Sequence, residues 1–190
     1  MKYKVKKILF LGYTDKETSL HSILASRGCQ VDHSVSKIIN TPDFDLIISF
    51  GYRHIIPNEI IINSCPIVNL HISFLPFNRG SHPNFWSHFD ATPSGVTVHL
   101  IDKGIDTGLY LFQKRVFFNT EKLTYKESYQ ILINEIESLF IHNIDEILSL
   151  EFEPKKYEEK GTYHSAADLP KEVNWNSIID DQLQILRKDK

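Results

Sequence analysis

The stretch "DLIISF", Asp45–Phe50, is a continuous apolar run bounded by polar and turn-forming residues. Such a run is typical of a strand buried on both faces, as in a parallel sheet covered by helices. Similar runs predict strands at Val5–Leu11 and at 66–71, and a helical pattern follows the first of them. Strands that alternate with helices predict an α/β fold with a mainly parallel sheet and helices on both faces.

Two of the predicted helices carry recognisable end signals. The helix within "DKETSLHSILASRG" is expected to begin at a cap formed by Thr14 or Asp15 and to end before Gly28. The helix predicted for 124–150 begins with a capping box, Thr124 and Glu127. Its apolar residues recur at helical spacing, and we assign them to the core: Tyr125, Tyr129, Leu132, Ile136, Leu139, Phe140, Ile144 and Ile147.

Composition restricts the class of protein. The 190 residues, 42% hydrophobic and 24% charged, suit one globular domain, which we expect to span 1–150. From 151 to 190 the sequence is charged and irregular, and we expect an extension that packs on this domain or on a second subunit of a homodimer. The net charge of −3 disfavours nucleic acid as a partner. No apolar run is long enough to span a membrane, and Cys29 and Cys65 are expected to be free thiols of a cytoplasmic protein.

Polar residues that could carry chemistry lie at the ends of predicted strands. Asn69 and His71, separated by one residue, point to the same face of their strand, and His99 ends the next one. Asp106 lies between two glycines in "DKGIDTG". An amide, an imidazole and a carboxylate can together run acyl transfer, and no serine or cysteine lies in a nucleophile-elbow pattern. Direct attack by a substrate amine therefore fits better than a covalent acyl-enzyme.

Each of these residues also has a structural interpretation. An Asn-x-His at a strand end is by itself more often structural than catalytic, and an Asp beside Gly is commonly a turn residue. The histidines of this region show no compact metal-binding spacing, so we expect no metal site. The order of the motifs along the chain is what favours catalysis.

That order, "NLHISFLPFNRGSHPNFW…GVTVHLIDKGIDTG", resembles the signature of formyltransferases that use 10-formyltetrahydrofolate: N-x-H-x-S-x-L-P, G-x-x-P-x-x-W, G-V-T-x-H and D-x-G. A weaker match follows at "GTYHSAADLPKEVNW". The resemblance implies a Rossmann-like, three-layer formyltransferase fold, here with a shortened N-terminal part. It implies the catalytic set Asn69, His71 and Asp106, with 10-formyltetrahydrofolate as co-substrate and no metal.

The resemblance also implies a folate pocket built from two loops, "GYRHIIP" and "IDKGID". Backbone groups can recognise the donors and acceptors of a pterin edge while side chains vary. The residues expected to bind the folate are Tyr52, Arg53, His54, Ile55, Ile56, His99, Asp102 and Gly104.

Departures from the family pattern concern the acceptor. The loop "GYTDKETS" is acidic and a poor phosphate cradle, which argues against glycinamide ribonucleotide. Methionyl-tRNA formyltransferases continue into a basic domain, whereas this acidic sequence ends at Lys190. The resemblance is closest to sugar N-formyltransferases and implies a nucleotide-linked amino-dideoxy sugar, in lipopolysaccharide O-antigen biosynthesis. Ser73, Asn78 and Arg79 are expected to bind this substrate, with Arg79 either pairing with a diphosphate or forming a salt bridge within its loop.

Two alternatives stay open. Within the enzyme class, the same residues could hydrolyse formyl-folate or formylate another small amine. Outside it, the shortened first third could mark a non-catalytic nucleotide-binding module.

Overall fold

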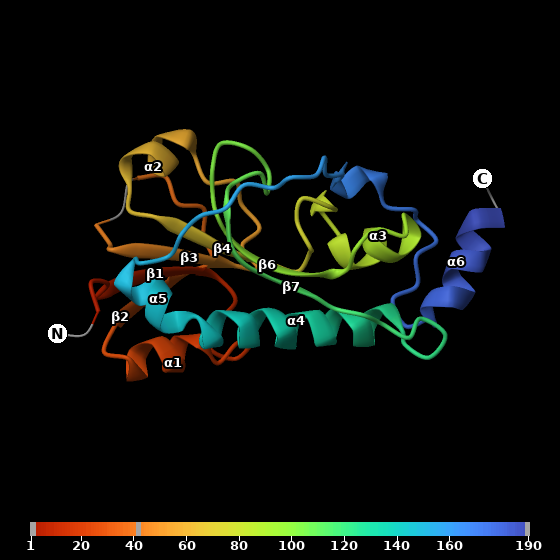
Figure 1. Cartoon of the computed structure of the whole chain (residues 1–190), viewed down its shortest axis with the longest axis horizontal. Coiled ribbons are helices and arrows are strands. Elements are labelled where there is room, and N and C mark those ends of the chain that lie inside the picture. Colours follow the sequence, from red (N-terminus) through yellow and green to blue (C-terminus); the bar gives the residue numbers. More distant parts are fainter. Residues whose placement is uncertain (1–2, 41–42, 189–190) are drawn as a thin grey trace.

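A single mixed sheet organises the computed structural model, which describes residues 3–40 and 43–188 (Figure 1). The six strands lie in the order β2-β1-β3-β4-β6-β7. The first four are parallel to one another, β6 is antiparallel to β4, and β7 is antiparallel to β6. The prediction of a mainly parallel sheet is therefore confirmed. The strand bounds are β1 (Lys7–Gly12), β2 (Gln30–Ser34), β3 (Leu46–Phe50), β4 (Ile67–His71), β6 (Gly95–Leu100) and β7 (Tyr110–Arg115).

Helices cover both faces of this sheet, as expected. On one face lie α1 (Leu20–Ser26), α4 (Tyr125–His142) and α5 (Ile144–Ser149), and on the other lies α2 (Asn58–Asn63) (Figure 1). Every residue of β3 is buried, because neighbouring residues enter opposite layers. Ile48 belongs to the hydrophobic cluster with α1 and α4, whereas Ile47 belongs to the cluster with α2.

The first helix begins later than predicted. Neither Thr14 nor Asp15 caps it, and its N-cap is Ser19, which makes no side-chain capping bond. The reason is local: the Glu17 carboxylate accepts hydrogen bonds from the backbone N–H and hydroxyl of Thr14 and closes a turn before the helix. The helix end is as predicted, with Gly28 at a φ of 86°.

The long helix differs from the prediction in its second half. The capping box of Thr124 and Glu127 is present, but α4 ends at Asn143, whose side chain donates to the Leu139 carbonyl, and α5 follows. Most of the predicted apolar stripe is buried or packs against the core. Tyr129 is an exception, with 39% of its surface exposed and its hydroxyl 2.6 Å from that of Tyr13.

The segment after residue 150 packs against its own chain. Its strand β8 (Tyr163–His164) pairs in parallel with β5 (Arg79–Gly80), and a short 3-10 helix (Ala166–Asp168) follows. Its helix α6 (Ile179–Lys188) packs on α3 (Pro83–Phe89) in a cluster rich in aromatic side chains (Figure 1). The extension thus packs against the rest of the chain through β8 and α6.

Two smaller expectations concern thiols and membranes. Cys29 and Cys65 are both free thiols. Among the described residues, no helix combines the length and the apolar character that crossing a membrane requires.

Candidate active site

Asn69 and His71 are the third and the last residue of β4 and point to one face of the sheet, as the sequence pattern predicts. The antiparallel neighbour β6 places His99 directly opposite Asn69. The Nδ1 atom of His99 lies 2.8 Å from the Leu100 carbonyl, which can only accept, so this nitrogen carries the ring proton. Nε2 of His99 then accepts from Asn69 Nδ2 at 3.1 Å. The second Nδ2 hydrogen of Asn69 remains to donate to a substrate.

Asp106 reaches the same place from the loop between β6 and β7. Its Oδ2 lies 3.6 Å from Nε2 of His71, and its Oδ1 lies 3.6 Å from Nε2 of His99. The backbone N–H of Gly80 donates to Oδ2 at 2.9 Å. Asp106 itself has a φ of 51°, a left-handed conformation that an Asp tolerates better than most residues. Side chains from β4, from β6 and from the loop after β6 therefore meet around one point.

The electrostatics of the site separate the two ionisable groups. Burial lowers the pKa of His71, the Asp106 carboxylate raises it, and His99 lowers it further, with a net shift below the usual value. Burial raises the pKa of Asp106, but His71, His99 and the Gly80 N–H outweigh it and hold this pKa far below its ordinary range. At neutral pH the site holds an ionised Asp106 beside a neutral His71. Among the described residues, Nε2 of His71 is a buried atom without a hydrogen-bond partner.

The two predicted folate loops lie together. Ile56 and Tyr52 of the first loop belong to the same hydrophobic cluster as Ile101, which begins the second loop. The Tyr52 hydroxyl donates to the Ser36 carbonyl and accepts from the N–H of Ile38, so this side chain fixes the loop. Ile55, by contrast, has 79% of its surface exposed.

The second loop is held by its own side chains. Asp102 accepts from the Gly104 N–H at 3.0 Å and from the Thr107 hydroxyl at 2.6 Å. Arg53 and His54 of the first loop are exposed. Side chains thus hold both loops in shape.

Some of the predicted binding residues are in the wrong place for that role. Ser73 and Asn78 have only 2% and 0% of their surface exposed, so neither side chain can contact a substrate. Ser73 donates to the Phe77 carbonyl, and the Asn78 amide bonds the hydroxyl of Thr92. His99 is 1% exposed and touches Asn69 and Asp106, so it positions these groups instead of contacting folate.

Of the two roles expected for Arg79, a salt bridge within its loop is not formed among the described residues. Nε of Arg79 donates to the Thr162 carbonyl at 3.3 Å, and no acidic side chain of the described residues forms an ion pair with it. The contact ties Arg79 to the C-terminal extension, a partner that its local sequence does not reveal.

A pocket of about 400 Å³ near the catalytic residues escaped the sequence analysis. It begins at Ile72, directly after His71, and reaches Trp175 in the extension, whose ring is stacked with that of His82 at 5.7 Å. Only the weak match around "VNW" pointed to this segment. The pocket is lined by Ile72, His82, Pro83, Asn84, Phe85, Tyr125, Lys126, Tyr129 and Trp175. Among the described residues, no group of three or more His, Cys, Asp or Glu is arranged to hold a metal ion.

Known proteins with similar sequences are formyltransferases. Over 151 residues the chain is 34% identical to the methionyl-tRNA formyltransferase of Clostridium perfringens strain SM101, covering 77% of this chain and 48% of that protein. The methionyl-tRNA formyltransferase of Thermodesulfovibrio yellowstonii is 33% identical over 152 residues, with the same coverage. The chain thus spans about half the length of these curated relatives.

Known structures resemble the fold more completely. The formyltransferase PseJ from Anoxybacillus kamchatkensis, solved with UDP-4,6-dideoxy-4-formamido-L-AltNAc and tetrahydrofolate, has a TM-score of 0.84 and 33% identity over 93% of this chain and 97% of that one. A 4-N formyltransferase from Francisella tularensis, at 23% identity, shares the fold, with a TM-score of 0.79 over 94% of this chain and 86% of that one. The family model described as "Formyl transferase" matches residues 11–142. The chain belongs to the formyl transferase family.

Proposed function

We propose that the protein transfers a formyl group from 10-formyltetrahydrofolate to the amine of a nucleotide-linked amino-dideoxy sugar. The observation that carries this proposal is the convergence of Asn69, His71 and Asp106 around His99. The similarity to PseJ, which covers nearly the whole of both chains, supports the choice of acceptor.

Each of the three residues has a role that its environment suits. Formyl-folate supplies an activated formyl group. The free N–H of Asn69 donates to the formyl oxygen as negative charge develops there, and neutral His71 is placed to donate a second hydrogen bond. The new bond joins the sugar nitrogen to the formyl carbon, and the bond from that carbon to the folate nitrogen breaks. Ionised Asp106 keeps His71 in place and helps to remove the proton that the attacking amine loses, and the folate nitrogen gains a proton as it leaves.

The aromatic pocket supports a nucleotide-linked acceptor. A nucleobase stacks well on an aromatic ring. The rings of Trp175 and His82 are stacked on each other, with their centres 5.7 Å apart, so a nucleobase can stack on the outer face of this pair. Lys126 lines the same pocket and can neutralise a phosphate. We place the nucleotide here and the amino sugar between this pocket and His71. The free thiols Cys29 and Cys65 suit the reducing cytoplasm in which we propose that the enzyme works.

One experiment separates this function from its alternatives. The protein is incubated with 10-formyltetrahydrofolate in parallel reactions, each with one acceptor. The acceptors are UDP- and dTDP-linked 4-amino-4,6-dideoxy sugars, glycinamide ribonucleotide and methionyl-tRNA. Mass spectrometry then detects the formylated product. We expect a formamido sugar and no other product. Methionyl-tRNA is included because the curated relatives act on it by name.

The result also distinguishes the rivals. Loss of formyl-folate without any acceptor indicates a hydrolase, and formylation of another amine alone means that the acceptor is wrong. Absence of any folate binding favours the non-catalytic module. Asn69→Ala is expected to lower turnover about 10²-fold or more, as the loss of an oxyanion donor does in other enzymes. The exposed His142→Ala serves as a control that leaves turnover unchanged.

A further inference from the structure

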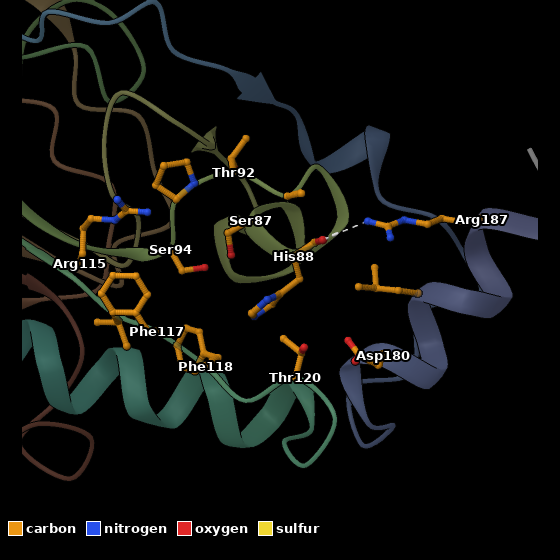
Figure 2. A pocket seen from close by; sticks show the side chains of 14 residues that line it. Ser87, His88, Thr92, Ser94, Arg115, Phe117, Phe118, Thr120, Asp180 and Arg187 are labelled. Carbon is orange, nitrogen blue, oxygen red and sulfur yellow. Dashed lines mark hydrogen bonds between the residues drawn. The ribbon is translucent and has the colours of Figure 1, made fainter.

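A second pocket, of about 520 Å³, lies between the end of α3, the connection into β6, the end of β7 and α6 (Figure 2). This size is within the range of small-molecule sites. None of Asn69, His71 and Asp106 lines it, so it is separate from the catalytic residues. The pocket is lined by Ser87, His88, Ala91, Thr92, Pro93, Ser94, Arg115, Val116, Phe117, Phe118, Thr120, Asp180, Leu183 and Arg187.

The charged side chains around this pocket leave a positive excess. Arg115 and Arg187 stand at opposite ends of it, and Asp180 is its one acidic lining residue (Figure 2). Arg187 donates to the carbonyls of His88 and Phe89, at 3.4 and 2.8 Å, which orients the guanidinium without neutralising its charge. Within residues 3–40 and 43–188, neither arginine forms an ion pair with a carboxylate.

A buried histidine faces the same space. His88 is only 9% exposed, and its ring points from α3 toward Phe118 and Thr120 (Figure 2). In the described part of the chain its Nε2 has no hydrogen-bond partner. Burial lowers the pKa of His88 to about 4, against a smaller opposing effect of Asp180, so the ring is neutral at pH 7. A buried polar atom without a partner is costly and uncommon, and a bound group would relieve that cost.

Apolar surface completes the pocket. Phe117 has 81% of its surface exposed, and the guanidinium of Arg115 lies 5.2 Å from the centre of its ring. Phe118 contacts the His88 ring edge to face, with the ring centres 5.3 Å apart. An anionic group and an apolar group therefore find complementary surfaces side by side.

We propose that this pocket is a second ligand site for a small organic anion, whose phosphate or carboxylate pairs with Arg115 while its apolar part lies on Phe117 and Phe118. The planar guanidinium forms paired hydrogen bonds with either anion. The imidazole of His88 supplies a neutral hydrogen-bonding group at the floor of the site. The inference depends on the pocket alone and not on the proposed formyl transfer.

Nuclear magnetic resonance of the ¹⁵N-labelled histidine side chains tests the site directly. The full chain is titrated with phenyl phosphate, benzoate and benzyl alcohol, and the His88 signal is assigned with His88→Gln. We expect a saturable shift of the His88 signal with at least one anion, and none with the uncharged alcohol at the same concentration. Phenyl phosphate and benzoate together tell which anion the site prefers.

Charge variants decide whether Arg115 is responsible for binding the anion. Arg115→Gln, at the exposed end of β7, is expected to weaken anion binding about tenfold or more, in line with the loss of a charge-assisted bond. The neighbouring Lys114→Gln is the matched control, because Lys114 pairs with Glu135 away from the pocket, and it should leave binding unchanged. No saturable shift with either anion, an equal shift with benzyl alcohol, or equal weakening by both variants would overturn the proposal.

Discussion

Burial and a neighbouring carboxylate act on the imidazole of His71 in opposite directions. Burial dominates, so the pKa of His71 lies below 6.5 although the nearby Asp106 carboxylate raises it. His99 adds a smaller lowering effect. In the proposed reaction this neutral ring donates one hydrogen bond to the formyl oxygen. Because the folded state then binds fewer protons than the unfolded chain, this residue costs stability as the pH falls below about 6.5.

Removal of the carboxylate should move this pKa downward. In Asp106→Asn the raising influence is lost while burial remains, so His71 should titrate at a lower pH than in the wild-type protein. The titration is followed by NMR of the labelled imidazole, which needs no activity. An upward shift, or a wild-type pKa above 6.5, contradicts this account of the site. The exposed His142→Ala should leave the His71 titration unchanged.

At the scale of elements, a strand from the extension holds the loop that carries part of the active site. The Arg79 and Ser81 N–H groups donate to the carbonyls of Thr162 and His164, at 3.1 and 2.9 Å. Gly80, between them, donates to the Asp106 carboxylate. A Cβ at Gly80 would lie 2.3 Å from the His164 carbonyl oxygen. The pairing of β5 with β8 therefore positions the N–H group that holds the Asp106 carboxylate.

Gly80→Ala should consequently lower turnover. The added methyl group must push β5 and β8 apart and so move the N–H that holds Asp106; a displacement of about 1 Å can cost up to about 10²-fold in rate. Gly28→Ala is the matched control, since its φ of 86° resembles the 91° of Gly80 but nothing lies within 4 Å of its Cβ. Both variants should lose stability through backbone strain, and only Gly80→Ala should lose turnover as well. Equal turnover in the two, measured alongside melting temperature, would exclude the positioning role.

Across the whole molecule, the extension supplies a third hydrophobic cluster beside the two that cover the sheet. Phe85, Trp86 and Phe89 of α3 pack with Tyr125 at the start of α4 and with Ile179, Leu183 and Leu186 of α6. The same helix α6 places Arg187 and Asp180 at the second pocket (Figure 2). The packing of this end of the protein and the lining of the second pocket therefore both depend on α6.

Truncation of a side chain on the two faces of α6 tests this dependence. Ile179→Ala should reduce the free energy of unfolding by about 2–5 kcal/mol, because a fully buried side chain leaves a cavity. Ile185→Ala, on the same helix but 56% exposed, should change it by less than about 0.5 kcal/mol. Denaturant unfolding measures both. Similar small losses would mean that α6 contributes little to the core.

Local pattern alone was enough for the elements and for part of the site. The apolar run of β3, the capping box of Thr124 and Glu127, and the shared direction of Asn69 and His71 depend only on neighbours in the chain. Periodicity and capping operate over a few residues, so a sequence displays them directly. The resemblance of the ordered motifs then identified the family without any structure.

Only the tertiary structure decided which polar groups face solvent and which are buried and hydrogen-bonded within the protein. Ser73 and Asn78 carry the motif but are buried, and the Gly80 N–H reaches Asp106 although a glycine shows no functional group in a sequence. The burial of His88 has the same origin. Burial and backbone hydrogen bonds arise where segments distant in the chain meet, as β8 meets β5 and α6 meets α3, and no short stretch of sequence contains both partners.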